Sequence, residues 1–122
     1  MTRQERVEEL IREEISTIIR EDVNDPRIGF VSITKVEVSP DLRNANIHVS
    51  IFGDENQKAE AMDGLNSATR FIRGALGNRI DFRVTPEIRF VRDDSLEKGS
   101  NVLNLIRKLK NEKPNKRASK KG

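Results

Sequence analysis

The sequence has no cysteine, tryptophan or tyrosine, and one histidine, His48. Without cysteine the chain forms no disulfide and offers neither a thiolate nucleophile nor a thiolate metal ligand, which suits a reducing compartment. A single histidine leaves a catalytic triad or a zinc site without its other members. We therefore expect a cytoplasmic protein that is not an enzyme, with no catalytic residue, no metal site and no cofactor.

Long apolar runs are also missing. No stretch approaches the roughly 20 apolar residues that span a bilayer, and the charged N-terminus lacks a signal-peptide core. We expect no membrane contact. A chain of 122 residues, 34% hydrophobic, has room for one domain with a small aliphatic core. Because the sequence shows no long coiled-coil heptad, we also expect a monomer.

The formal net charge of +3 is distributed unevenly along the chain. Residues 1–25 carry four Arg against eight acids, residues 70–92 carry six Arg against two acids, and the residues after Glu112 carry five basic side chains and no acid. Sorted charge of this kind favours a polyanion on the basic side. The acidic N-terminal segment would then face solvent or a basic protein.

Apolar residues recur at helical spacing between Thr2 and Glu21, and Thr2 with Glu5 fits a capping box. Residues 24–26, ending in Pro26, predict the end of this first helix, because proline lacks a backbone donor and biases its predecessor away from helical angles.

Two strands are predicted next. The apolar alternation changes parity near residues 34–36, which indicates a β-bulge in the first strand. Residues 39–41 are turn formers, and residues 45–51 alternate between apolar and polar, with Phe52 at the next outward position. The pattern predicts an antiparallel hairpin with one buried face.

A second helical pattern runs from Leu65 to Leu76. Helical winding places Arg70, Arg73, Gly74 and Gly77 on the side away from its apolar residues. Glycines there weaken the helix by about 1 kcal/mol each relative to alanine, and they leave the backbone open to a ligand. Alternatively, the glycines only mark a helix break or a C-cap, and both interpretations stay open. We expect a broken helix in this segment.

A third strand is predicted between residues 82 and 90, with Arg83 and Arg89 on its polar face. Pro86 lacks a donor, so the strand begins after it or lies at an edge. Asp94 and Glu97 can cap a last short helix over residues 102–109. The domain then spans residues 1–112, and residues 113–122 form a flexible basic tail.

This order predicts an α+β fold, a three-stranded mixed sheet covered on one face by helices. The order helix, strand, strand, broken helix, strand is also that of a type II KH domain. Such modules grip nucleic acid and usually carry a GxxG loop. Residues 74–77 read GALG, but that match alone is weak.

A dispersed but ordered set of residues is more specific, and through it the chain resembles the bacterial ribosome-binding factor A family. The segments that carry the resemblance are Asp25 to Gly29, Ser39 to Leu42, Phe71 to Arg73 with Leu76 and Gly77, Arg83 with Pro86 to Ile88 and Phe90, and Asp94, Ser95, Glu97 and Gly99. The similarity extends over about residues 3 to 110.

The resemblance implies a KH-like factor that binds the free small (30S) ribosomal subunit during late maturation of 16S rRNA. It further implies assistance to processing at the 5′ end of that RNA and support of growth in the cold. The family marks a kink between two helices with Ala-x-Gly, which falls here on Ala68, Thr69 and Arg70. The kink residues therefore lie among Ala68, Arg70, Gly74 and Gly77.

Arginine binds phosphate through two donors and stacks on bases, so the arginine-rich segment suggests an RNA-binding surface. We expect Arg70, Arg73, Arg83 and Arg89 to converge on one cationic platform. The basic tail would add Lys113, Lys116, Arg117, Lys120 and Lys121 as a salt-sensitive second contact.

Two alternatives remain open. An RNA-processing enzyme would use Asp93 and Asp94 as metal ligands or His48 as a base, although a carboxylate ahead of a helix is ordinarily a cap and His48 has no partners. A protein-interaction module would dock the acidic first helix on a ribosomal protein.

Overall fold

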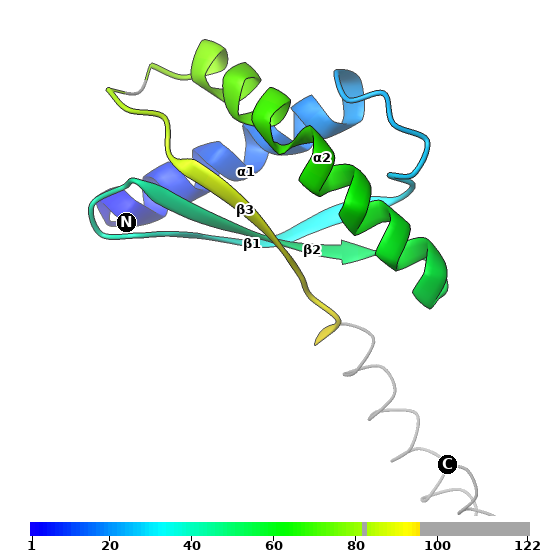
Figure 1. Cartoon of the computed structure of the whole chain (residues 1–122). Coiled ribbons are helices and arrows are strands. Elements are labelled where there is room, and N and C mark those ends of the chain that lie inside the picture. Colours follow the sequence, from blue (N-terminus) through cyan, green and yellow to red (C-terminus); the bar gives the residue numbers. More distant parts are fainter. Residues whose placement is uncertain (82, 96–122) are drawn as a thin grey trace, which may run out of the picture.

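The computed structural model describes residues 1–81 and 83–95. Its elements are α1 (Arg3–Glu21), β1 (Val31–Val38), β2 (Asn44–Ile51), α2 (Glu55–Arg79) and β3 (Glu87–Arg92). Both helices lie on the same side of the sheet (Figure 1). The predicted α+β architecture is confirmed. The last short helix, the domain boundary at residue 112 and the basic tail lie outside the described residues.

The sheet has the strand order β1-β2-β3, with β2 in the centre. β2 runs antiparallel to β1 and parallel to β3. A parallel pair needs a long crossover, and α2 supplies it. The register of the hairpin shifts between Ile33 and Lys35, which confirms the predicted bulge.

Both helices begin with a reciprocal cap. At α1 the Thr2 hydroxyl accepts from the Glu5 backbone N–H at 3.1 Å, and the Glu5 carboxylate accepts from the Thr2 N–H at 2.8 Å. Asp54 and Gln57 form the same box at α2. Each box satisfies two N–H groups that the first helical turn leaves without a partner, so both helix starts are fixed locally.

The core lies between the helices and one face of the sheet. Ile47 and Val49 of the central strand are fully buried. They pack with Ile11, Ile15 and Ile18 of α1, Leu65, Ile72 and Leu76 of α2, and Ile88 and Phe90 of β3. Alternation along each strand turns the remaining side chains to the other face.

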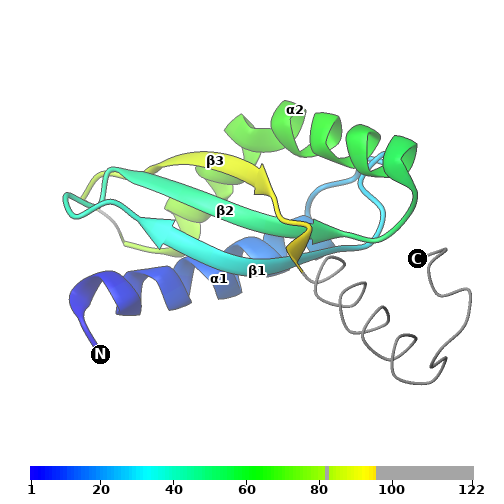
Figure 2. The ribbon, with the colours of Figure 1, turned by 90° about the horizontal axis from the view of Figure 1, so that it is seen from below.

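That other face is covered by none of the described elements, and Figure 2 views the sheet from this side. We call it the open face. Its side chains include Ser32, Lys35 and Glu37 of β1, Asn46, His48 and Ser50 of β2, and Arg89 of β3.

Two expectations about the second half of the chain are corrected, the break in the second helix and the burial of two apolar side chains. Helix α2 runs without interruption from Glu55 to Arg79, so the predicted break at residues 68–70 or at Gly74 is absent. Ala68 packs against the core and so supports the helix there. The third strand begins at Glu87, directly after Pro86, which confirms the first of the two alternatives predicted for this proline. Val84 and Phe71 lie outside the core, 52% and 53% exposed.

Within the described ranges, no helix combines the length and apolarity needed to cross a membrane.

Candidate nucleic-acid interface

A shallow hollow lies between the C-terminal half of α2 and the loop that leads into β3. Its lining residues are Arg70, Arg73, Gly74, Gly77, Asn78 and Thr85. A second hollow continues from it along α2 and shares Arg70 and Arg73. We call the two together the α2–β3 groove. Two of the four predicted arginines therefore meet in one place.

Arg73 is bound to the protein itself. Its Nε donates to the Pro86 carbonyl at 3.0 Å, and its Nη2 donates to the Thr85 carbonyl at 2.7 Å. Glu87 lies 3.4 Å from the same Nη2. These contacts fasten the loop before β3 to α2, so the guanidinium acts first as a structural clamp.

Arg70 differs from Arg73 in its surroundings. It is exposed, and among the described residues its side chain makes no hydrogen bond or ion pair. Its five N–H donors are therefore available to an anion in the groove. Arg70 is the group of the α2–β3 groove best suited to hold a phosphate.

The two glycines of the groove have different reasons to be glycine. A Cβ built on Gly77 would lie 2.8 Å from the Thr85 hydroxyl oxygen, so this glycine allows the loop to pack closely on α2. A Cβ on Gly74 would meet nothing within 4 Å. Gly77 therefore serves close packing, which neither sequence-based alternative predicted, whereas Gly74 leaves open space beside Arg70.

Arg83 lies in a different hollow, at the end of the molecule where α1 begins. There it is joined by Arg3 and Arg43, which come from distant parts of the chain. We call this the arginine hollow. Two acids, Asp41 and Asp81, also line it. The Ser39 hydroxyl and the Arg43 backbone N–H donate to the Asp41 carboxylate and lower its pKa, so Asp41 stays charged. Sequence reasoning missed Arg3 and Arg43, since neither spacing nor local motif links them to Arg83.

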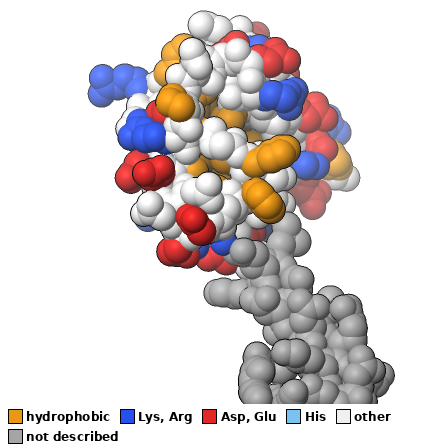
Figure 3. All heavy atoms as spheres, turned by 90° about the vertical axis from the view of Figure 1, so that its right-hand side faces the viewer, with side chains coloured by type: hydrophobic (Ala, Val, Ile, Leu, Met, Phe, Trp, Pro, Cys, Tyr) orange, Lys and Arg blue, Asp and Glu red, His pale blue; other side chains and the backbone are white. Residues whose placement is uncertain are grey.

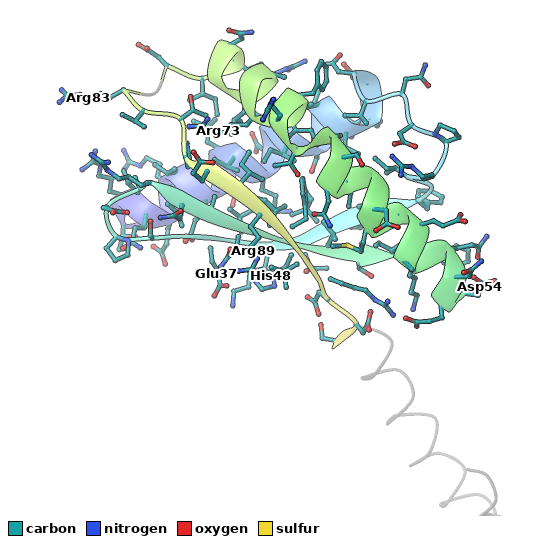
Figure 4. The ribbon with its side chains drawn as sticks, in the orientation of Figure 1. Glu37, His48, Asp54, Arg73, Arg83 and Arg89 are labelled. Carbon is teal, nitrogen blue, oxygen red and sulfur yellow. The ribbon has the colours of Figure 1, made fainter. Side chains whose placement is uncertain are left out.

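Arg89 projects from β3 on the open face, in the neighbourhood of His48 and Glu37 (Figure 4). Figure 4 also shows Arg83 away from it, on the loop that precedes β3. The expected convergence of four arginines on one platform is therefore wrong. Arg89 lies on β3, which alternates between two faces, whereas Arg70 and Arg73 lie on a helix that covers only one of them. Lys113, Lys116, Arg117, Lys120 and Lys121 lie outside the described residues.

His48 is half-buried on the open face, with its Nε2 2.7 Å from a Glu37 carboxylate oxygen. This hydrogen bond, followed by that from Lys35, lowers the pKa of Glu37. The polar sheet-face position predicted for His48 is confirmed.

The two carboxylates after β3 have separate partners. Asp93 accepts from the Thr34 hydroxyl at 2.7 Å and from the Ser95 backbone N–H at 2.9 Å. Asp94 pairs with Arg92 Nε at 3.0 Å. The Ser95 N–H donates to Asp93 and not to Asp94. Glu97, the other half of the expected cap, is outside the described residues. Residues 1–81 and 83–95 contain no group of three or more potential metal ligands.

Two of the acids on α1 hold the fold together instead of facing solvent. Glu8 accepts from the Val38 backbone N–H at 2.9 Å. Glu14 lies 3.1 Å from Arg79 of α2, which also approaches Asp22 at 3.6 Å. The α1 surface offered to a basic partner is therefore smaller than the sequence indicated.

A family model described as ribosome-binding factor A matches residues 3–106. The chain belongs to the ribosome-binding factor A family. Ribosome-binding factor A from Halothermothrix orenii is 50% identical over 115 residues, which cover 94% of each chain. The Dictyoglomus thermophilum relative is 52% identical over 108 residues, 88% of this chain and 90% of that one.

Solved structures of the ribosome-binding factor A family have the same fold. A solution structure from Thermotoga maritima gives a TM-score of 0.66 at 32% identity, covering 73% of this chain and 85% of that one. A homology model of Thermus thermophilus ribosome-binding factor A, fitted into a cryo-EM map of a 30S complex, gives 0.56 at 24% identity, with 75% of this chain and 92% of that one covered. The latter likeness concerns the fold alone.

Proposed function

We propose that this protein is a non-enzymatic ribosome assembly factor in the cytoplasm. It binds the free 30S subunit and assists late maturation and 5′-end processing of 16S rRNA. The observation that carries the proposal is the family match over residues 3–106. The 30S complex of the Thermus thermophilus relative supports the choice of the small subunit.

The contact surface follows from the exposed arginines. The α2–β3 groove ends at Thr85, and the arginine hollow begins with Val84 and Arg83 of the same loop. An RNA backbone that follows this loop meets Arg70 and the open space at Gly74 on one side, and Arg83 with its two neighbouring arginines on the other. Planar guanidinium groups bind phosphate through paired donors. Several such groups along one loop favour a phosphate backbone over a small ligand.

The mechanism is binding without a covalent step. Affinity comes mainly from charge, with the basic tail as a further contact, and specificity comes from the shape of the RNA. A ligand shifts an equilibrium only by binding one state better than the other. The factor would therefore hold one arrangement of a bistable rRNA segment during maturation.

Sedimentation with purified ribosomal particles tests the partner. We expect the protein to co-sediment with free 30S subunits and to stay in the supernatant with 50S subunits and with joined ribosomes. Equal binding to all three particles, or to none, contradicts the proposal. Chemical probing of immature 30S subunits then tests the mechanism, since an unchanged pattern at saturating occupancy excludes a shift between RNA arrangements.

Matched arginine variants test the surface. Arg70→Gln and Arg83→Gln should each weaken 30S binding and reduce the slope of log affinity against log salt by about 0.7 per lost phosphate contact, if the RNA behaves as single-stranded. Arg89→Gln removes the same charge from the open face and serves as the control. A larger loss for Arg89→Gln than for the other two would place the RNA on the open face instead.

A further inference from the structure

The open face ends in two exposed aromatic side chains. Phe30 and Phe52 are 80% and 81% exposed, and they lie side by side because the Phe52 N–H donates to the Phe30 carbonyl at 3.1 Å. Together with Val31, Ser32, Ser50, Ile51 and Gly53 they line a hollow, which we call the phenylalanine patch. Figure 3 looks onto this end of the molecule, where hydrophobic side chains stand out on the surface. Exposed apolar surface of this kind marks an interaction site.

The described chain leaves the fold close to the phenylalanine patch. After β3, the Asp93 N–H donates to the Val49 carbonyl of β2 at 2.7 Å, and the Asp93 carboxylate accepts from Thr34 of β1. One residue thus ties the end of β3 to both other strands, and Figure 2 shows the chain crossing β2 toward β1. Val49 is two residues from Ile51 of the patch, about 7 Å at the rise of a strand. The described chain therefore ends near the patch.

The sequence of that segment fits an apolar surface with an acidic border. Four of its apolar residues, Val102, Leu103, Ile106 and Leu109, share a helical spacing, and Leu105 lies next to that stripe. Residues 96–110 carry four basic side chains and one acid. At the patch end of the fold, Glu55 and Asp94 pair with Arg92, and their chain neighbours Asp54 and Asp93 are also acidic. The acids there repel a phosphate backbone and attract a basic segment. Charge therefore favours the chain's own segment over RNA bases as the occupant.

We propose that residues 96–110 dock on the phenylalanine patch of the same molecule, with Leu103 and Ile106 against the rings of Phe30 and Phe52. The short connection through Ser95 makes the contact intramolecular, so a modest apolar area is enough to hold it. The basic tail that follows would then start from a fixed point at this end of the sheet.

The lack of tryptophan and tyrosine gives a direct test in the full-length chain. Phe52→Trp introduces a single tryptophan, whose emission we expect to be shifted to the blue by the docked segment. Adding Leu103→Asp and Ile106→Asp should move the emission to that of a solvent-exposed tryptophan. Adding Asn101→Asp and Asn104→Asp changes the charge equally at positions on the opposite helical side, and should leave the emission unchanged.

Three fluorescence results overturn the proposal. The first is a solvent-exposed emission in Phe52→Trp that neither pair of aspartates alters. The second is a blue shift that appears only when a single-stranded RNA oligonucleotide is added, which assigns the patch to bases. The third is a blue shift that disappears on dilution, which assigns it to a second copy of the chain.

Trypsin supplies a second measurement that does not depend on the tryptophan. Docking should delay cleavage at Arg107 and Lys108 relative to cleavage at Lys116 and Arg117. Phe30→Ser should accelerate cleavage at the first pair and leave the second pair unchanged, with the far-ultraviolet circular dichroism confirming that the variant is folded. Equal rates at the first pair in both proteins would contradict docking.

Discussion

At the scale of single residues, the environment of each arginine decides its role. Arg73 donates to two carbonyls of the loop before β3, whereas Arg70, one helical turn earlier, makes no contact with any described acid. The two side chains share a groove and a charge. We therefore expect Arg73 to contribute mainly to stability and Arg70 mainly to binding.

Replacement of each by methionine tests this difference. Arg73→Met removes two charge-assisted hydrogen bonds and leaves the Thr85 and Pro86 carbonyls without their donor, so we expect a loss of about 1–3 kcal/mol in the free energy of unfolding. Arg70→Met should change it by less than about 0.5 kcal/mol. Urea unfolding measures both, and equal losses would mean that Arg70 also has a structural partner.

The two glycines of the groove allow a second matched comparison of variants. Gly74→Ala places a methyl group in open space and should stabilise the protein by roughly 0.5–1 kcal/mol through helix propensity. Gly77→Ala should stabilise less or destabilise, because the new Cβ meets the Thr85 hydroxyl at 2.8 Å. In a Thr85→Ala background the Gly77→Ala change should recover the gain seen at Gly74. Urea unfolding measures the change in the free energy of unfolding for each variant.

Asp93 makes stability depend on pH. Hydrogen bonds from Thr34 and from Ser95 lower its pKa to about 2. Since this folded-state value lies below the unfolded value of roughly 3.9, the carboxylate stabilises the fold above about pH 4, and the contribution disappears as the pH falls toward 2.

We expect Asp93→Asn to flatten the fall of unfolding free energy between pH 4 and pH 2. Thr34→Val should raise the pKa of Asp93, as followed by an NMR titration of its carboxyl carbon. A titration midpoint that stays near 2 in Thr34→Val would show that Thr34 is not the main cause.

At the scale of elements, α1 protects one edge of the sheet. Gln4 donates to the Val38 carbonyl and Glu8 accepts from the Val38 N–H, both at 2.9 Å. An edge strand exposes such groups to pairing with other chains. Here the helix satisfies them at the end of β1, so α1 both covers the core and closes part of the edge.

Loss of this contact should be measurable. Glu8→Ala leaves the part-buried Val38 N–H without its acceptor, and we expect a cost of about 1–2 kcal/mol. Glu9→Ala changes an exposed neighbour of the same charge and should cost less than about 0.5 kcal/mol. Thermal unfolding of both variants gives the comparison. If the two melt together, the hydrogen bond to Val38 contributes nothing to stability.

At the scale of the whole molecule, two layers share one core. The helices cover a single face of the sheet, and Ile47 of the central strand is fully buried between the layers. Stability comes from this core, whereas the proposed functions lie on the surface. The arginines proposed to bind RNA lie at and beside the α2–β3 loop, and the phenylalanine patch lies at the opposite end of the hairpin.

A core substitution tests this division. Ile47→Ala should lower the free energy of unfolding by about 2–5 kcal/mol, because it removes buried methylene groups and leaves a cavity. Phe71→Ala, at a side chain that is 53% exposed, should cost much less. Under conditions where Ile47→Ala remains folded, its affinity for 30S subunits should match that of the parent. A proportional loss of affinity would link the core directly to the binding surface.

Several parts of the fold could be predicted from local pattern. The capping box at Thr2, the end of α1 before Pro26, the bulge beside Thr34 and the constraint at Pro86 were all predicted and are confirmed. The break in α2 was predicted from glycine and from a family signature and is wrong, because packing of Ala68 and Ile72 on the core supports the helix through that region. Phe71 fitted the apolar spacing and is nevertheless exposed.

The amino-acid sequence by itself determined the elements and the family, since helix periodicity, strand alternation and turn chemistry act between residues close in the chain. Only the tertiary structure decided which arginines are neighbours. Arg3, Arg43 and Arg83 meet because three distant segments end at the same corner of the molecule. Arg89 lies on the open face of the sheet, whereas Arg70 lies on a helix that covers the other face. The physical reason is that a charged side chain's partners depend on the packing of elements far apart in sequence, and no local spacing encodes that packing.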